Sequence, residues 1–107
     1  MIKITILYPN THGSRFDVSY YVETHMPMSI RLLGAHPGFK GASVERGLGG
    51  AVPGSPPAYI AMCNFLFNSI EDFLAAFMPH AAMLQSDMPN YTDIAPVIQF
   101  NEVLMSK

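Results

Sequence analysis

The residues best suited to chemistry lie in the segment YYVETHMPMS, residues 20–29. His25 follows Tyr21 by four residues and precedes Pro27 by two. Imidazole has an ordinary pKa of about 6.5, so a histidine can accept or release a proton at neutral pH. A tyrosine hydroxyl one helical turn away can orient the ring or polarise a substrate oxygen. The segment therefore predicts acid/base catalysis by His25, assisted by Tyr21.

This segment belongs to a predicted helix that begins at Asp17, a suitable N-cap, and ends at GAHPG, residues 34–38. His25 shares an apolar stripe, at three- and four-residue spacing, with Val18, Tyr21, Met28 and Leu32. Pro27 has no N–H to donate to the Glu23 carbonyl, so the helix should kink or restart there. We expect the kink to leave a gap beside an inward-facing His25.

A second helix, predicted over residues 68–84, has the same arrangement. Ser69 is followed by Asp72 at capping-box spacing, and Pro79 interrupts the helix next to His80. Two interruptions facing one sheet predict a cleft between the helices and the strands. The alternative is purely structural: a proline allows a helix to curve over a twisted sheet, and a half-buried histidine hydrogen-bonds a freed carbonyl.

The sequence contains no His-Glu-x-x-His, paired Cys-x-x-Cys, Gly-x-Ser-x-Gly or Gly-x-Gly-x-x-Gly motif. Glu23 lies two residues from His25, on another face of the helix, and is a poor co-ligand for it. We therefore expect no metal site and no cofactor, with haem held by His25 or His80 as an alternative. The side chains expected to bind a substrate in the cleft are Tyr8, Asn64, Phe77, His80 and Tyr91.

Composition excludes several classes of protein. The 107 residues are enough for one domain, and the net charge of −2 comes with scattered cations, so nucleic acid is not an expected partner. The single cysteine, Cys63, lies in an apolar run typical of a buried side chain. There is no signal-peptide pattern and no apolar run long enough to span a membrane. We expect a cytoplasmic protein.

Four strands are predicted around the two helices, at residues 2–8, 39–48, 58–67 and 94–104. The order β-α-β-β-α-β, with right-handed crossovers, predicts a ferredoxin-like α+β fold: an antiparallel sheet with both helices on one face. The run at 58–67 is apolar on both sides, so the open face carries either its odd-numbered or its even-numbered residues. Either set favours a homodimer that covers this face.

Several segments resemble the EthD family over nearly the whole chain: RFDVSYYVETHMPM, GFKGASVERGLGG, FNSIEDFLAAFMPHAAML and PNYTDIAPVIQFNEV. The resemblance implies one EthD-type domain over residues 1–107, assembled as a dimeric α/β barrel. The family is named for the degradation of ethyl tert-butyl ether, where EthD accompanies a cytochrome-type monooxygenase. The wider superfamily includes cyclases, lactone isomerases and monooxygenases, several of which need no metal or prosthetic group.

Residues and resemblance together predict a protein associated with oxidative degradation of ethers or other apolar compounds. It should bind a small hydrophobic, oxygen-containing molecule beside His25, with cofactor-free chemistry of an oxidoreductase, cyclase or isomerase. The alternative is a non-catalytic binding protein, or an accessory to a monooxygenase partner. Polar side chains within hydrogen-bond reach of His25 would favour the enzyme, and a wholly apolar pocket would favour the binding protein.

Overall fold

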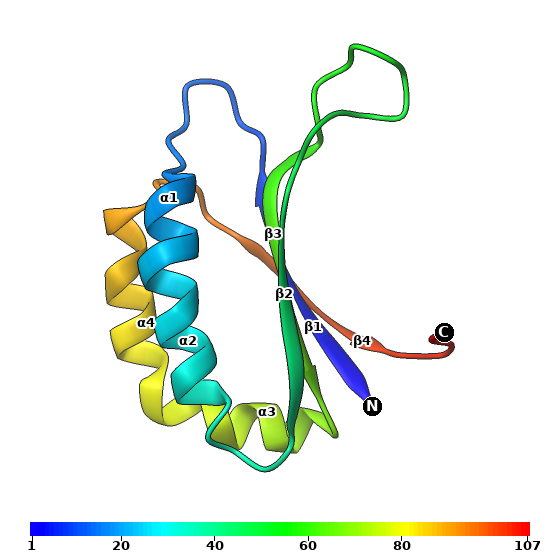
Figure 1. Cartoon of the computed structure of the whole chain (residues 1–107). Helices are drawn as coiled ribbons and strands as arrows, with labels where there is room; N and C mark the ends of the chain where they lie inside the picture. The colour runs from blue at the N-terminus through cyan, green and yellow to red at the C-terminus, as the bar shows by residue number, and fades with distance from the viewer.

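A single four-stranded antiparallel sheet forms the frame of the protein in the computed structural model, which describes residues 1–107. The strands are β1 (Ile2–Pro9), β2 (Phe39–Arg46), β3 (Tyr59–Phe67) and β4 (Val97–Glu102), in the spatial order β2-β3-β1-β4. All the helices lie against one face of the sheet (Figure 1). The predicted ferredoxin-like α+β fold is confirmed.

The register of β3 decides which of its residues face the helices. Cys63 pairs with Ile6 of β1, and the odd-numbered residues from Ala61 to Phe67 are buried. The even-numbered Met62 and Leu66 are half-buried on the open face, whereas Ile60, at the register shift opposite Tyr8 and Pro9, packs against the core. Because side chains alternate along a strand, this single register assigns both faces.

The first helical segment is continuous in space (Figure 1), but its winding changes along its length. It runs through α1 (Val18–Tyr20), a π-helical turn η1 (Tyr21–His25) and α2 (Met26–Leu33). The predicted cap is present: the Tyr20 N–H donates to Asp17 Oδ1 at 3.1 Å. The Met26 N–H donates to the carbonyl of Tyr21, five residues back. The expected break at Pro27 thus takes the form of a widened turn, with Pro27 in the first turn of α2.

The π-helical turn also changes which residues of α2 face the sheet. The buried side chains after His25 are Met26, Ser29 and Leu33, whereas the predicted Met28 and Leu32 are only half-buried. A π turn holds one more residue than an α turn, so it rotates every later side chain about the helix axis. The inward stripe past His25 is therefore centred on Met26, Ser29 and Leu33, and the predicted Met28 and Leu32 lie at its edge, packed against the core.

The second helical segment bends sharply. It contains α3 (Ile70–Phe77), the 3-10 turns η2 (Met78–His80) and η3 (Met88–Asn90), and α4 (Ala81–Asp87). Ser69 caps α3 as expected, with its Oγ accepting from the Asp72 N–H at 3.1 Å. At η2, which contains Pro79, the chain turns so that α3 crosses one end of the sheet while α4 runs along its face (Figure 1).

The fourth strand is shorter than expected. It begins at Val97, directly after Pro96, because proline cannot donate to the strand ladder. The preceding segment brings Tyr91 and Ile94 into the core instead. No helix combines the length and the apolar character needed to cross a bilayer.

Candidate functional site

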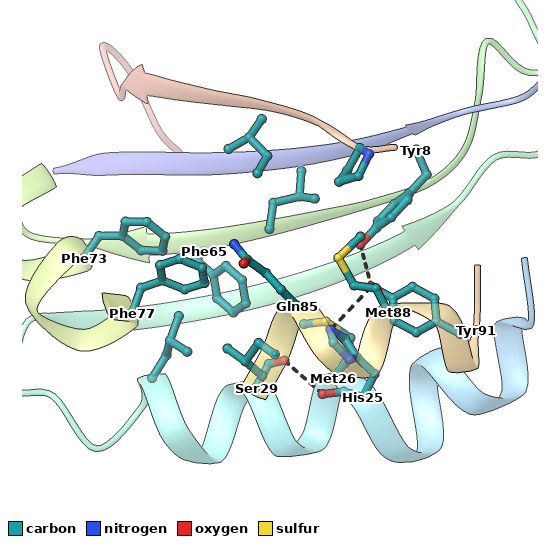
Figure 2. A pocket seen from close by; sticks show the side chains of 15 residues that line it. Tyr8, His25, Met26, Ser29, Phe65, Phe73, Phe77, Gln85, Met88 and Tyr91 are labelled. Carbon is teal, nitrogen blue, oxygen red and sulfur yellow. Dashed lines mark hydrogen bonds between the residues drawn. The ribbon is translucent and has the colours of Figure 1, made fainter. Parts of the chain in front are cut away.

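A cavity of about 290 Å³ lies between the helices and the sheet. Eleven of its fifteen lining residues are hydrophobic, and the other four are His25, Ser29, Gln85 and Pro96. The hydrophobic ones are Ile6, Tyr8, Met26, Leu33, Phe65, Phe73, Phe77, Leu84, Met88, Tyr91 and Ile98. The volume is at the small end of the range for ligand pockets. Figure 2 shows its polar groups near one end and its phenylalanines at the other.

His25 reaches this cavity from the π-helical turn and is paired on its far side with a carboxylate. Its Nδ1 lies 2.8 Å from Asp87 Oδ2, at the last residue of α4. Both side chains are largely buried, with exposed fractions of 9% for His25 and 16% for Asp87. A carboxylate can only accept, so Nδ1 carries the proton, and Nε2 of the neutral ring is an acceptor.

Asp87 is itself held by two further donors. The Tyr20 hydroxyl donates to Asp87 Oδ1 at 2.7 Å, and Asn90 Nδ2 donates to the same oxygen at 2.9 Å. Burial would raise the pKa of Asp87, but the hydrogen bonds from His25, Tyr20 and Asn90 outweigh it and hold the pKa below its ordinary value. The group facing Nδ1 is therefore a carboxylate at neutral pH.

Two tyrosines continue the row of polar groups beyond His25. The Tyr91 hydroxyl lies 3.5 Å from His25 Nε2 and 2.8 Å from the Tyr8 hydroxyl (Figure 2). Burial raises the pKa of both tyrosines above the ordinary value, so both hydroxyls keep their protons at neutral pH. The result is a row of four polar groups, Asp87, His25, Tyr91 and Tyr8, with 2.8 Å contacts within each end pair and a longer contact of 3.5 Å between His25 and Tyr91.

Tyr21 supports this row from behind. It is almost fully buried, and its ring stacks on His25 with centroids 5.8 Å apart and planes 13° from parallel. It also packs edge-on to Tyr8 and against Tyr91. Tyr21 does not line the cavity, so it fixes the orientation of the imidazole through packing.

The other end of the cavity is aromatic and apolar. Phe73 and Phe77 of α3 are stacked, with centroids 5.3 Å apart, and Phe65 of β3 lies beside them (Figure 2). Gln85 of α4 lies between the two ends. Ser29 Oγ donates to the His25 carbonyl at 2.9 Å and is thereby occupied. This end suits the ring or alkyl part of a ligand.

The structure brings some of the residues predicted to form the site together and separates others. Tyr8, His25, Phe77 and Tyr91 line the cavity. His80 lies in η2 outside the lining.

Asn64 lies on the opposite face of the sheet. Its Oδ1 accepts from Thr5 Oγ1 at 2.7 Å, and its Nδ2 donates to Glu45 Oε1 at 3.0 Å. The register of β3 gives its even-numbered side chains to the open face, so Asn64 has no access to the cavity.

Sequence reasoning missed Asp87, the direct partner of His25, along with its supports Tyr20 and Asn90. Asp87 lies in DMPN, a pattern that by itself indicates a turn. It is 62 residues from His25, and no local spacing links the two. The only feature of the sequence that pointed toward this contact was the proline in each helix, because both interruptions were expected on the same face of the sheet.

Neither a metal site nor a haem site is apparent from the side chains. No group of three or more His, Cys, Asp or Glu side chains is placed to hold a metal ion. For haem, His80 lies outside the cavity, and Nε2 of His25 faces the Tyr91 hydroxyl. His25 is the only histidine that lines the cavity, and the volume of about 290 Å³ is small for a macrocycle of haem size, so the residues present do not fit the haem alternative.

Comparison with known proteins bears on the family and the fold of this chain. The EthD domain family matches residues 14–95. An EthD-like protein of Ralstonia eutropha is 46% identical, with a TM-score of 0.92 over 99% of this chain and 94% of that one. An EthD family protein of Bacillus halodurans is 19% identical and similar in fold, with a TM-score of 0.73 over 97% of this chain and 99% of that one.

A more distant likeness shows the fold alone. SnoaB of Streptomyces nogalater, a cofactor-independent oxygenase, is 14% identical and has a TM-score of 0.59 over 98% of this chain and 94% of that one. No curated protein matches the sequence. The match over residues 14–95 and the 46% identity to the Ralstonia protein establish that this chain belongs to the EthD family.

Proposed function

We propose that this EthD-family protein binds a small apolar, oxygen-containing molecule in the cavity and transfers a proton to or from it through His25. The observation that carries the proposal is the pairing of His25 with Asp87 on one side and the cavity on the other. An imidazole fixed in one tautomer by a carboxylate is a typical general base. The biological setting proposed is the oxidative degradation of ethers or other apolar compounds.

The proton transfer uses the groups as they stand. His25 Nε2 accepts a proton from a ligand C–H or O–H bond, and the electron pair remains on the ligand as an enolate or phenolate. Asp87 stabilises the resulting imidazolium across the 2.8 Å contact. A hydroxyl from Tyr8 or Tyr91 donates to the developing oxyanion. Enolisation, cyclisation and cofactor-free oxidation all begin with such a step, and the SnoaB likeness is compatible with it.

The second candidate is a non-catalytic protein that sequesters an apolar intermediate or assists a monooxygenase. The mainly hydrophobic wall of the cavity favours it. Against it stand the polar side chains around His25, since a carrier has no use for a buried carboxylate–imidazole pair.

We also propose that two copies of the chain associate through the open face of the sheet. That face carries half-buried Leu7, Met62 and Leu66 with no helix over them. Covering such side chains is worth roughly 1.5–3 kcal/mol each, and a symmetric dimer covers both copies of the patch at once.

Binding is tested first, with thermal unfolding in the presence of small phenols, ketones, ethers and lactones. Ser29→Leu should fill the cavity, and Ser19→Leu is its matched control on the exposed side of α1. We expect some compounds to raise the Tm of the wild type and of Ser19→Leu but not of Ser29→Leu. Equal stabilisation of Ser29→Leu by the same compounds would place binding elsewhere.

Catalysis is tested on the compounds that bind. His25→Ala should lower turnover by about 10²–10⁴-fold with little change in affinity, because general-base catalysis contributes about that much. Circular dichroism shows whether the variant remains folded. Undiminished turnover by a folded His25→Ala would remove His25 from the reaction, and an absence of turnover with every bound compound would favour the binding protein.

A further inference from the structure

The protons at the polar end of the cavity can be counted. In the neutral His25 ring, Nδ1–H is committed to Asp87, which leaves Nε2 as an acceptor. Tyr8 and Tyr91 bring two hydroxyl protons. The two hydroxyls lie 2.8 Å apart and share one hydrogen bond in which either can be the donor. One hydroxyl proton and the Nε2 lone pair therefore remain.

These two remaining groups are only weakly paired with each other. The Tyr91 hydroxyl is 3.5 Å from Nε2, at the long limit for a hydrogen bond, so this contact is worth little. When Tyr91 instead donates to Tyr8, the Tyr8 proton and the Nε2 lone pair both become available to a ligand. Tyr8 and His25 both line the cavity.

We infer that the cavity selects a hydroxylated aromatic molecule, of phenol type, over the corresponding methyl ether. A ligand hydroxyl can accept from Tyr8 and donate to His25 Nε2, whereas an ether oxygen can only accept. The phenylalanines at the opposite end provide the surface for the aromatic ring (Figure 2). This inference rests on the proposed function, because it assumes that the cavity is the binding site.

The inference has a consequence for the order of reactions. In the degradation of an aryl ether, this cavity would hold the phenol released by cleavage of the C–O bond. The reaction that supplies its ligand would then be an O-dealkylation or a ring hydroxylation. Gln85, the remaining polar side chain of the lining, lies away from His25 and makes no hydrogen bond that would satisfy Nε2.

Asp87 determines which nitrogen of His25 is the acceptor, so it is the positioning residue for this selectivity. In Asp87→Asn, the amide oxygen should take the place of Oδ1, which already accepts from Tyr20 and Asn90. The amide NH₂ then faces Nδ1 and donates to it, which moves the ring proton to Nε2. An Nε2–H donor suits the ether oxygen, so the preference for a hydroxyl should disappear.

The test compares 1-naphthol with 1-methoxynaphthalene at neutral pH by calorimetric titration. We expect the wild type to bind 1-naphthol about tenfold or more tightly, since leaving a buried acceptor unpaired is costly. Asp87→Asn should bring the ratio near one, while Glu71→Gln, a charge-matched exposed control on α3, should leave it unchanged. The ¹⁵N shifts of the His25 ring should report Nδ1–H in the wild type and Nε2–H in Asp87→Asn.

Each of the alternative results of this titration contradicts a specific part of the inference or of the proposed binding site. Equal affinity of the wild type for both compounds would overturn the inference and leave the proposed binding site in place. Binding of neither compound, up to the solubility limit, would overturn the inference together with the proposed aromatic pocket. An unchanged naphthol preference in folded Asp87→Asn, with the ring proton moved to Nε2, would show that the selectivity does not come from His25.

Discussion

At the scale of single residues, Asp87 has the largest effect on what His25 can do. A neutral imidazole can carry its proton on either nitrogen, and the 2.8 Å contact to Asp87 assigns the proton to Nδ1 and leaves Nε2 as the acceptor. Tyr20 and Asn90 hold Asp87 in place, and Tyr21 stacks on the ring. The site is therefore a supported pair, as preorganised catalytic sites require.

The pH dependence of stability follows from the lowered pKa of Asp87. The folded-state pKa lies below the unfolded value of about 3.9, so the stabilisation from Asp87 is fully present above pH 4 and is lost as the pH falls through the folded-state pKa. We expect the free energy of unfolding of the wild type, measured in urea, to fall more steeply below pH 4 than that of Asp87→Asn. Parallel curves for the two proteins would contradict the pairing of Asp87 with His25, Tyr20 and Asn90.

Cys63 provides a second test at this scale. It is completely buried in β3, and burial raises the pKa of its thiol to about 12. Only the thiolate is nucleophilic, so a thiol reagent should label the native protein at least about 100-fold more slowly than the unfolded protein at pH 8. The rate, followed by absorbance or mass spectrometry, should rise with urea in parallel with unfolding. Rapid labelling without denaturant would contradict the packing of β3 against the helices.

At the scale of elements, the π-helical turn η1 and the bend at η2 position the site. The turn presents Tyr21 and His25 to the same side while its wider winding redirects α2. The bend lets α3 close one end of the cavity with Phe73 and Phe77 while α4 carries Asp87 back to His25. Pro27 lies just after the π turn, and Pro79 lies within η2. At both positions the missing N–H of proline costs little.

Deleting Glu23, an exposed residue of η1, should convert the π turn into an α turn. His25 then follows Tyr21 by three residues instead of four, at about 100° each, so its position around and along the helix axis shifts relative to Asp87. We expect the free energy of unfolding to fall by about 3 kcal/mol or more and the ¹⁵N signature of His25 paired with Asp87 to disappear. Deletion of Val52, in the exposed loop between β2 and β3, is the control and should change neither quantity appreciably.

At the scale of the whole molecule, the helices leave one face of the sheet open. A chain of hydrogen bonds crosses this face, from Glu45 through Asn64 and Thr5 to Asn101. Apolar side chains flank this polar row on both sides. Paired polar groups cost little to bury, so the face is compatible with coverage by a second copy.

The proposed dimer is tested by Met62→Lys and Leu66→Lys, which place charges on the open face. Sedimentation should show the wild type at twice the chain mass of 11.8 kDa and the double variant as a monomer. Val22→Lys, on the solvent side of η1, should remain a dimer. A wild type that sediments as a monomer at micromolar concentration would rule out a stable dimer.

The sequence by itself determined the features that depend on neighbours along the chain. Alternation identified β1, three- and four-residue spacing identified the helices, and the caps at Asp17 and Ser69 were predicted from residue type. The order of the elements then predicted the ferredoxin-like fold. The inward position of His25 was predicted from its spacing of four residues from Tyr21 on the apolar stripe. These features arise from local sterics and from the burial of one apolar face of each element. The spacing of apolar residues along the sequence indicates that face.

Only the tertiary structure decided which distant groups meet. The face of β3 that turns to the helices is set by strand register, which an apolar run on both sides leaves open. The exclusion of Asn64 from the cavity follows from that register. The π turn, which changes which residues of α2 face the sheet, depends on how the helix packs in the folded chain. The contact of His25 with Asp87 depends on how two helices pack on one sheet, and a hydrogen bond between residues so far apart leaves no periodic trace in the chain.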